Sequence, residues 1–175
     1  MQYNGIDIEN EYKKNLSDAQ DKLASLSVTK EYFSDIRNKN DSLLGFKGLN
    51  GWVYEQTIRY CLCEELKKFG KAPNIKEQEQ LYGRTKVDLL VGKVAIEIKV
   101  SGLYNKSDAE KYRGYSTKAK EKGWYYFYLT QKEGYPPYQI AIKSVLGEEN
   151  TFFLNAENDW ERFVNKVLKH YEEKP

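Results

Sequence analysis

The chain has 175 residues, of which 31% are charged and 40% hydrophobic, a balance typical of a folded globular domain rather than a disordered one. No run approaches the ~18 apolar residues of a membrane span, and the N-terminus lacks a signal-peptide pattern, so we expect an intracellular protein without a membrane partner. The formal net charge of +2 is low for a protein that coats nucleic acid non-specifically, but it allows a local DNA-binding surface.

The N-terminal segment, residues 7–40, is expected to be helical. One apolar helix face is indicated by side chains that recur every three or four residues, namely Ile8, Tyr12, Leu16, Ala19, Leu23 and Leu26. A shorter helix is expected to begin near Thr29. The apolar face either packs against the rest of the domain or forms the interface of a homodimer.

A boundary is expected at the turn-rich residues 45–51, which would separate an N-terminal helical arm, residues 1–44, from a domain of residues 45–175. A helix is then expected from Trp52 to Phe69, closed by Gly70. Its apolar stripe comprises Ile58, Leu62, Leu66 and Phe69, and Glu55 lies on the same stripe. A carboxylate there is costly unless it is paired or coordinating, although the nearby helix N-terminus also favours a negative charge.

A strand is expected at residues 75–82, followed by a hairpin over residues 85–101. Gly92 and Lys93 suit a type II′ turn, which sets Val91 opposite Val94 and Asp88 opposite Glu97. One face of the hairpin is then aliphatic, with Val87, Leu89, Val91, Val94, Ile96 and Ile98. The other face carries Asp88, Glu97 and Lys99, because side chains alternate along a strand.

The remaining elements are a helix at 108–122 that stops at Gly123, a buried strand at 124–129, a loop with Gly134 and two prolines, and a strand at 138–145. A C-terminal helix has one apolar face, formed by Trp160, Phe163, Val164, Val167, Leu168 and Tyr171. This order predicts an α/β (α+β) fold with a central mixed sheet flanked by helices.

The carboxylates of the hairpin indicate either a metal site or an internal ion pair. Two directly opposed carboxylates, with Cβ atoms about 5 Å apart, repel each other unless a cation lies nearby. Mg²⁺ commonly binds one or two carboxylates together with water and phosphate oxygens. Alternatively, Lys99 relieves the repulsion between Asp88 and Glu97 without any metal.

A helix bearing Glu55, followed by a hairpin with Asp88 and the Glu97-x-Lys99 motif, resembles the PD-(D/E)xK nuclease superfamily. The resemblance covers about residues 48–130, and Val87 stands where the signature has proline. It implies a restriction endonuclease-like fold and a Mg²⁺-dependent endodeoxyribonuclease, with Mn²⁺ as a substitute and no small-molecule cofactor. It also implies metal binding by Asp88, Glu97 and the Ile98 carbonyl. By the same resemblance, Glu55 would bind metal indirectly or at a second position, Lys99 would orient the attacking water, and the enzyme would be a homodimer.

Contacts with DNA phosphates are expected from basic residues interleaved with aromatic ones. They are Lys86, which the hairpin register sets opposite Lys99, and Lys106, Lys111, Tyr112, Arg113, Tyr115 and Lys118. The same basic helix could instead be only a solvated surface. The alternatives for the whole chain are a Holliday junction or branched-DNA resolvase, a catalytically inert DNA-binding module on the same fold, and a glycosidase with paired carboxylates.

Overall fold

The computed structural model describes residues 2–3, 6–25, 42–71 and 74–171. Its helices are α1 (Ile8–Ser25), α3 (Ser42–Lys68), α4 (Asp108–Glu121), α5 (Pro136–Leu146) and α6 (Asp159–Tyr171), with a 3₁₀ turn η1 (Glu148–Asn150). The strands are β1 (Gln2–Tyr3), β2 (Ile6–Asp7), β3 (Ile75–Tyr82), β4 (Thr85–Val91), β5 (Val94–Lys99), β6 (Tyr125–Thr130) and β7 (Thr151–Phe153). No helix in the described ranges is long and apolar enough to cross a membrane.

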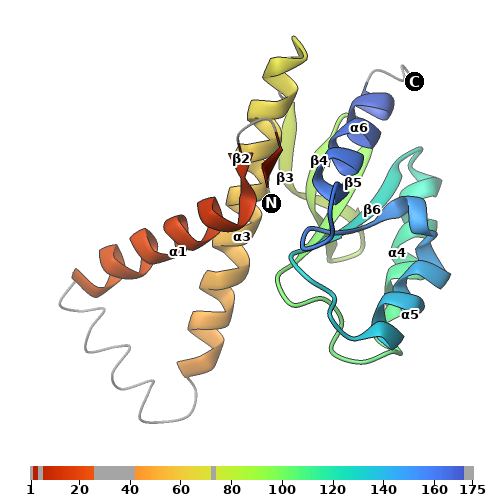
Figure 1. Cartoon of the computed structure of the whole chain (residues 1–175). Helices are drawn as coiled ribbons and strands as arrows, with labels where there is room; N and C mark the ends of the chain where they lie inside the picture. The colour runs from red at the N-terminus through yellow and green to blue at the C-terminus, as the bar shows by residue number, and fades with distance from the viewer. Residues whose placement is uncertain (1, 4–5, 26–41, 72–73, 172–175) are drawn as a thin grey trace.

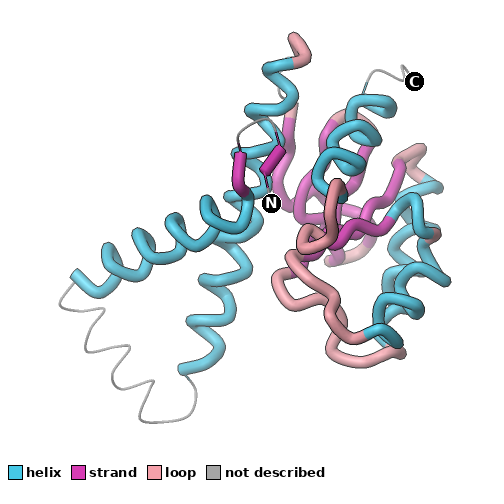
Figure 2. Tube along the Cα trace, in the orientation of Figure 1, coloured by secondary structure: helices cyan, strands magenta, loops and turns pink. Residues whose placement is uncertain are grey.

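A mixed sheet with the strand order β3-β4-β5-β6-β7 forms the centre of the molecule. Neighbouring strands are antiparallel from β3 to β5 and parallel from β5 to β7. Helices cover both faces of this sheet (Figures 1 and 2). One apolar cluster joins α1, α3 and α6 to the first face, and a second joins α4 and α5 to the other face. The predicted α/β class with a mixed sheet flanked by helices is confirmed.

The central hairpin has the predicted register next to its turn, but the predicted pairing of Asp88 with Glu97 lies beyond the paired residues. Val91 pairs with Val94, Leu90 with Ala95 and Leu89 with Ile96. Gly92 has φ +58°, as the first central position of a type II′ turn requires. The predicted aliphatic face is correct except at Val87, which packs with α4 and α5 in the second cluster rather than with α3 and α6. The alternation of faces is therefore interrupted at Asp88.

The turn predicted at residues 45–51 is wrong, because α3 runs without a break from Ser42 to Lys68. Burial of Val53, Tyr54 and Ile58 stabilises this helix, and packing outweighs the ~1 kcal/mol that each helical glycine costs. The helix ends at Lys68, one residue before the predicted end, and the predicted closing residue Gly70 follows in a turn with φ +70°. Phe69 was expected on the apolar stripe, but it is 46% exposed.

The N-terminal helix α1 begins beside the sheet domain and extends away from it together with the first half of α3 (Figure 1). Ile8 and Tyr12 belong to the core cluster, and Leu16 and Ala19 pack against that cluster. The start of the apolar face thus packs within the chain. The side chains of Leu23 and Leu26 and the short helix expected near Thr29 lie outside the described residues.

The strand predicted at residues 138–145 is wrong, because this segment is the helix α5. Pro136 and Pro137 open α5 at its first turn, where their missing N–H groups cost nothing. The edge strand instead follows as β7, parallel to β6. The other predicted elements, β3, α4, β6 and α6, are confirmed.

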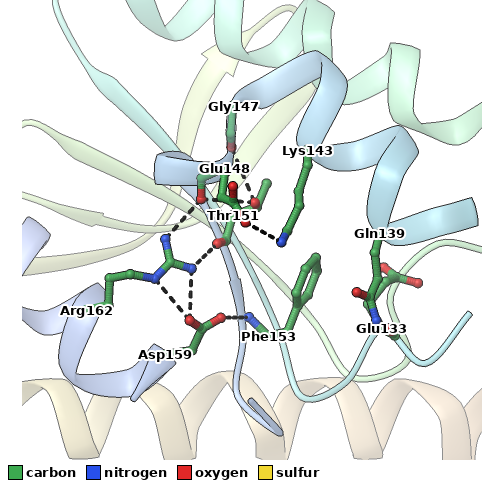
Figure 3. Close-up of polar contacts among 9 residues, drawn as sticks. All are labelled: Glu133, Gln139, Lys143, Gly147, Glu148, Thr151, Phe153, Asp159 and Arg162. Carbon is green, nitrogen blue, oxygen red and sulfur yellow. Dashed lines mark hydrogen bonds and ion pairs between the residues drawn. The ribbon is translucent and has the colours of Figure 1, made fainter. Parts of the chain in front are cut away.

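Arg162 and Asp159 on α6 fix this short edge strand (Figure 3). The Arg162 guanidinium donates to the carbonyl oxygens of Glu148 and Thr151 at 2.9 and 2.6 Å. Asp159 accepts from Arg162 Nε at 3.0 Å and from the Phe153 amide at 2.7 Å. A helix side-chain pair therefore satisfies backbone groups at both ends of β7, which compensates for the strand's shortness.

Candidate active site

Asp88 lies where β4 separates from β5. The paired positions of the two strands reach Leu89 and Ile96, and β5 then continues beside β6. The Ile98 amide donates to Asp88 Oδ2 at 2.7 Å. The Asp88 side chain thus takes the place of a backbone acceptor, and its carboxylate faces the last residues of β5.

Glu97 and Lys99 point to the same side of β5, as the alternation along a strand predicted. Lys99 Nζ lies 2.6 Å from Glu97 Oε1 and 3.6 Å from Asp88 Oδ2. It also donates to the Ile98 carbonyl oxygen at 3.0 Å. The three oxygen groups expected to bind a metal ion are therefore gathered around one point, and in this structure the ammonium group contacts all of them.

Glu97 is 5% exposed, and the Tyr126 hydroxyl donates to its Oε2 at 3.5 Å. Burial raises the pKa of Glu97, and the nearby Asp88 carboxylate raises it further, while Lys99 opposes both effects. Burial by itself would lower the pKa of Lys99, but Glu97 and Asp88 outweigh burial and raise it. The two carboxylates therefore favour the charged form of Lys99.

Glu55 reaches the same group of residues from α3. The Gln78 side-chain amide donates to Glu55 Oε2 at 3.4 Å and to Asp88 Oδ1 at 3.5 Å, so one amide bridges the two carboxylates. Burial raises the pKa of Glu55 to about 7, with further contributions from Asp88 and Glu97. Three carboxyl groups thus converge beside Lys99, and burial together with their mutual repulsion raises the pKa values of Glu55 and Glu97.

Searches of protein-family models, curated proteins and solved structures find no match to this chain. The site must therefore be judged from its own geometry.

The side chains of this site could bind a cation such as Mg²⁺ only together with a backbone carbonyl oxygen and with oxygens from water or substrate. Within the described ranges, no group of three or more His, Cys, Asp or Glu side chains is arranged to hold a metal ion. Asp88, Glu97 and the Ile98 carbonyl supply oxygen donors, and Mg²⁺ usually completes its shell with water and phosphate oxygens. Glu55 would then act through water or at a second position.

Of the residues expected to contact DNA, the basic ones lie on the surface, whereas the two tyrosines pack against the rest of the protein. Lys86 pairs with Gln80 on β3, and the predicted pairing of Lys86 with Lys99 is absent from the described β4–β5 register. Tyr112 is 5% exposed and Tyr115 packs against the same cluster, so neither ring is free to stack on a base.

The basic residues of the predicted DNA-binding set lie on the surface. Lys111 is exposed, and its ammonium group lies 5.3 Å from the ring centres of Tyr112 and Tyr115. Arg113 and Lys118 form ion pairs with Glu110 and Glu121 on their own helix, and exposed pairs of this kind are weak enough to exchange for a phosphate. Lys106 is exposed in the loop before α4.

Sequence reasoning missed Gln78 and Tyr126, which contact the carboxylates. Gln78 lies in a polar strand that offers no pattern to distinguish it, and only its φ of +52° marks it in the structure. Tyr126 belongs to an aromatic strand whose sequence is typical of the hydrophobic core. Its hydroxyl group was the only sequence feature that suggested a polar contact.

Proposed function

We propose that the chain is a Mg²⁺-dependent endodeoxyribonuclease with a restriction endonuclease-like core. The observation that carries this proposal is the convergence of Asp88, Glu97, the Ile98 carbonyl and Lys99 on one point, with Glu55 bridged to Asp88 through Gln78. The order of a helix bearing Glu55, a hairpin with the other site residues, then α4 and β6, also supports it.

Lys99 beside Glu97 and the basic residues of α4 favour a reaction on a phosphodiester over one on a sugar, because a phosphodiester is negatively charged. Asp88, Glu97 and the Ile98 carbonyl would hold Mg²⁺, or Mn²⁺ as a substitute. The bound cation would neutralise charge on the scissile phosphate and lower the pKa of a water molecule. Lys99, displaced from its ion pairs, would orient that water against the phosphorus. Burial strengthens each of these charge interactions, because the medium around Glu97 has a low dielectric constant.

Cleavage of supercoiled plasmid, linear duplex and four-way junction DNA tests the proposal. We expect cleavage with Mg²⁺ or Mn²⁺ and none with EDTA. Glu97→Gln and Lys99→Met should abolish it, whereas Lys67→Ala, which removes an exposed lysine paired with Glu64, should not. Circular dichroism of each variant controls for folding.

The choice of substrate separates the proposal from its alternatives. A strong preference for the junction over the duplex would replace the endonuclease with a branched-DNA resolvase. DNA binding without cleavage of any substrate under these conditions would indicate an inert binding module. Cleavage that continues in EDTA would contradict the metal-dependent mechanism.

A further inference from the structure

Two loops leave the sheet beside the candidate active site. Residues 100–107 follow β5, and residues 131–135 follow β6, which runs parallel to β5. Lys99 and Thr130, the last residues of the two strands, are paired, and the Gln131 amide donates to the Lys99 carbonyl oxygen at 3.1 Å. Both loops therefore begin next to the Lys99 side chain.

Glu133 joins the two loops to each other. Its buried carboxylate accepts hydrogen bonds from the Leu103 amide at 3.1 and 3.3 Å and from the Tyr128 hydroxyl at 3.4 Å. Gly102 has φ +73°, and the Glu133 carboxylate fills the space that a Cβ at Gly102 would need. Gln139 at the start of α5 donates to the Glu133 carbonyl oxygen (Figure 3). The loops thus form one supported unit.

This unit presents two exposed aromatic side chains. Tyr104 is 80% exposed and Tyr135 is 57% exposed. Tyr138 supports both, because its ring packs edge-on against Tyr135 at a centroid distance of 4.7 Å and its hydroxyl donates to the Tyr104 carbonyl oxygen at 3.1 Å. Burial does not explain either ring, since more than half of each side chain is exposed.

The charges on the two loops favour a phosphate-bearing ligand. Lys106 and Lys132 are exposed, whereas the carboxylate of Glu133 is buried and hydrogen-bonded. The exposed formal charges within residues 100–107 and 131–135 are therefore all positive. Tyr104 and Tyr135 each lie five residues beyond the end of a strand, β5 and β6 respectively. Each is therefore at most about 17 Å from that strand end, which is the length of a few nucleotides.

We propose that Tyr104 and Tyr135 form a stacking platform for unpaired bases, so that the preferred substrate carries single-stranded DNA next to the cleaved phosphodiester. This inference rests on the proposed nuclease function. An aromatic ring stacks on any base and is sequence-tolerant, but paired bases inside a duplex do not offer their faces. Lys106 and Lys132 would contact the flanking phosphates.

Fluorescence anisotropy with labelled single-stranded, duplex and forked DNA of matched sequence, measured in EDTA, tests the platform. Tyr104→Ala and Tyr135→Ala should each weaken binding of single-stranded and forked DNA about fivefold or more, as loss of one stacked base predicts. Duplex affinity should stay unchanged. Phenylalanine at either position should restore binding, because it keeps the ring. Tyr60→Ala, which removes a tyrosine 55% exposed on α3, is the matched control and should change neither affinity.

The outcomes distinguish the platform from the nuclease proposal. Equal losses for single-stranded and duplex DNA, or no loss, would overturn the platform even if the wild type cleaves DNA with Mg²⁺. Selective loss of single-strand binding in a protein that cleaves nothing with Mg²⁺ would support the platform and reject the nuclease. Unchanged thermal melting of both alanine variants confirms that the loops keep their fold.

Discussion

Gln78 combines a strained backbone with a contact to two carboxylates. A non-glycine residue with φ +52° costs on the order of 1 kcal/mol, and such strain persists where the surroundings hold it. We expect Gln78→Gly to leave the free energy of unfolding unchanged or raise it by about 1 kcal/mol, because glycine relieves the strain. Cleavage should fall, because the amide between Glu55 and Asp88 is lost. Urea denaturation and plasmid cleavage measure the two effects.

The neighbouring variant Gln80→Ala is a control for Gln78→Gly, since the Gln80 side chain bonds to the Gly83 carbonyl oxygen and not to a carboxylate. It should leave cleavage unchanged. Wild-type cleavage by Gln78→Gly would show that the bridging amide plays no part in the reaction.

Asp88 has a structural contact as well as its proposed metal contact. Asp88→Asn keeps an oxygen that can accept from the Ile98 amide, whereas Asp88→Ala leaves this amide without the carboxylate. In EDTA we expect the asparagine variant to be about as stable as the wild type. The alanine variant should lose about 1–3 kcal/mol, the cost of an unsatisfied buried donor. Both should fail to cleave DNA, and equal stability of the two would contradict the proposed role of this hydrogen bond.

At the level of elements, two glycines of α4 have opposite roles. Gly114 lies within the helix with open space where a Cβ would be, whereas Gly123 ends it with φ +71°. Gly114→Ala should stabilise the protein by about 0.5–1 kcal/mol, because alanine has the higher helix propensity. Gly123→Ala should destabilise it, because a Cβ disfavours that backbone conformation. Thermal melting of the two variants tests the assignment, and shifts of the same sign would contradict it.

Sequence periodicity predicted those elements whose local signals agree. The Gly92 turn determines the hairpin register, and alternation then places Glu97 beside Lys99. The prediction from sequence failed where one residue type is compatible with two different structures. Pro136 and Pro137 suit a loop or a first helical turn, and Gly51 suits a turn or a helix whose packing tolerates it.

The candidate site was only partly predictable for a related reason. Strand alternation places Glu97 and Lys99 on one side of β5, whereas Asp88 lies where β4 leaves β5 and accepts a hydrogen bond from the Ile98 amide. Glu55 could be placed on the correct helix face, but its approach to Asp88 depends on how α3 crosses the sheet. Gln78 depends on a left-handed backbone conformation at a polar residue, which no pattern indicates.

For the molecule as a whole, we propose a homodimer, because the apolar positions spaced along residues 8–26 offer a helix face to a second copy of the chain. The apolar face of α1 is partly used within the chain, since Ile8 and Tyr12 lie in the core. The interface would therefore involve the part of the α1–α3 pair that extends away from the sheet (Figure 1). Light scattering coupled to gel filtration should give twice the mass of one chain, and a single-chain mass at high concentration would contradict the proposal.

The position of the site within the sheet has a consequence for amide hydrogen exchange. β5 lies between β4 and β6 with Val94–Ile98 buried, so its amides should exchange only when the whole domain unfolds. β3, which carries Gln78, is an edge strand with mostly exposed or half-buried side chains, and it should open in smaller fluctuations. Mass spectrometry of exchanged peptides should show protection of β5 long after β3 has exchanged. Glu97 and Lys99 on β5 would then stay in place as long as the domain is folded. Gln78 on β3, which bridges Glu55 and Asp88, would move away and return in the native protein.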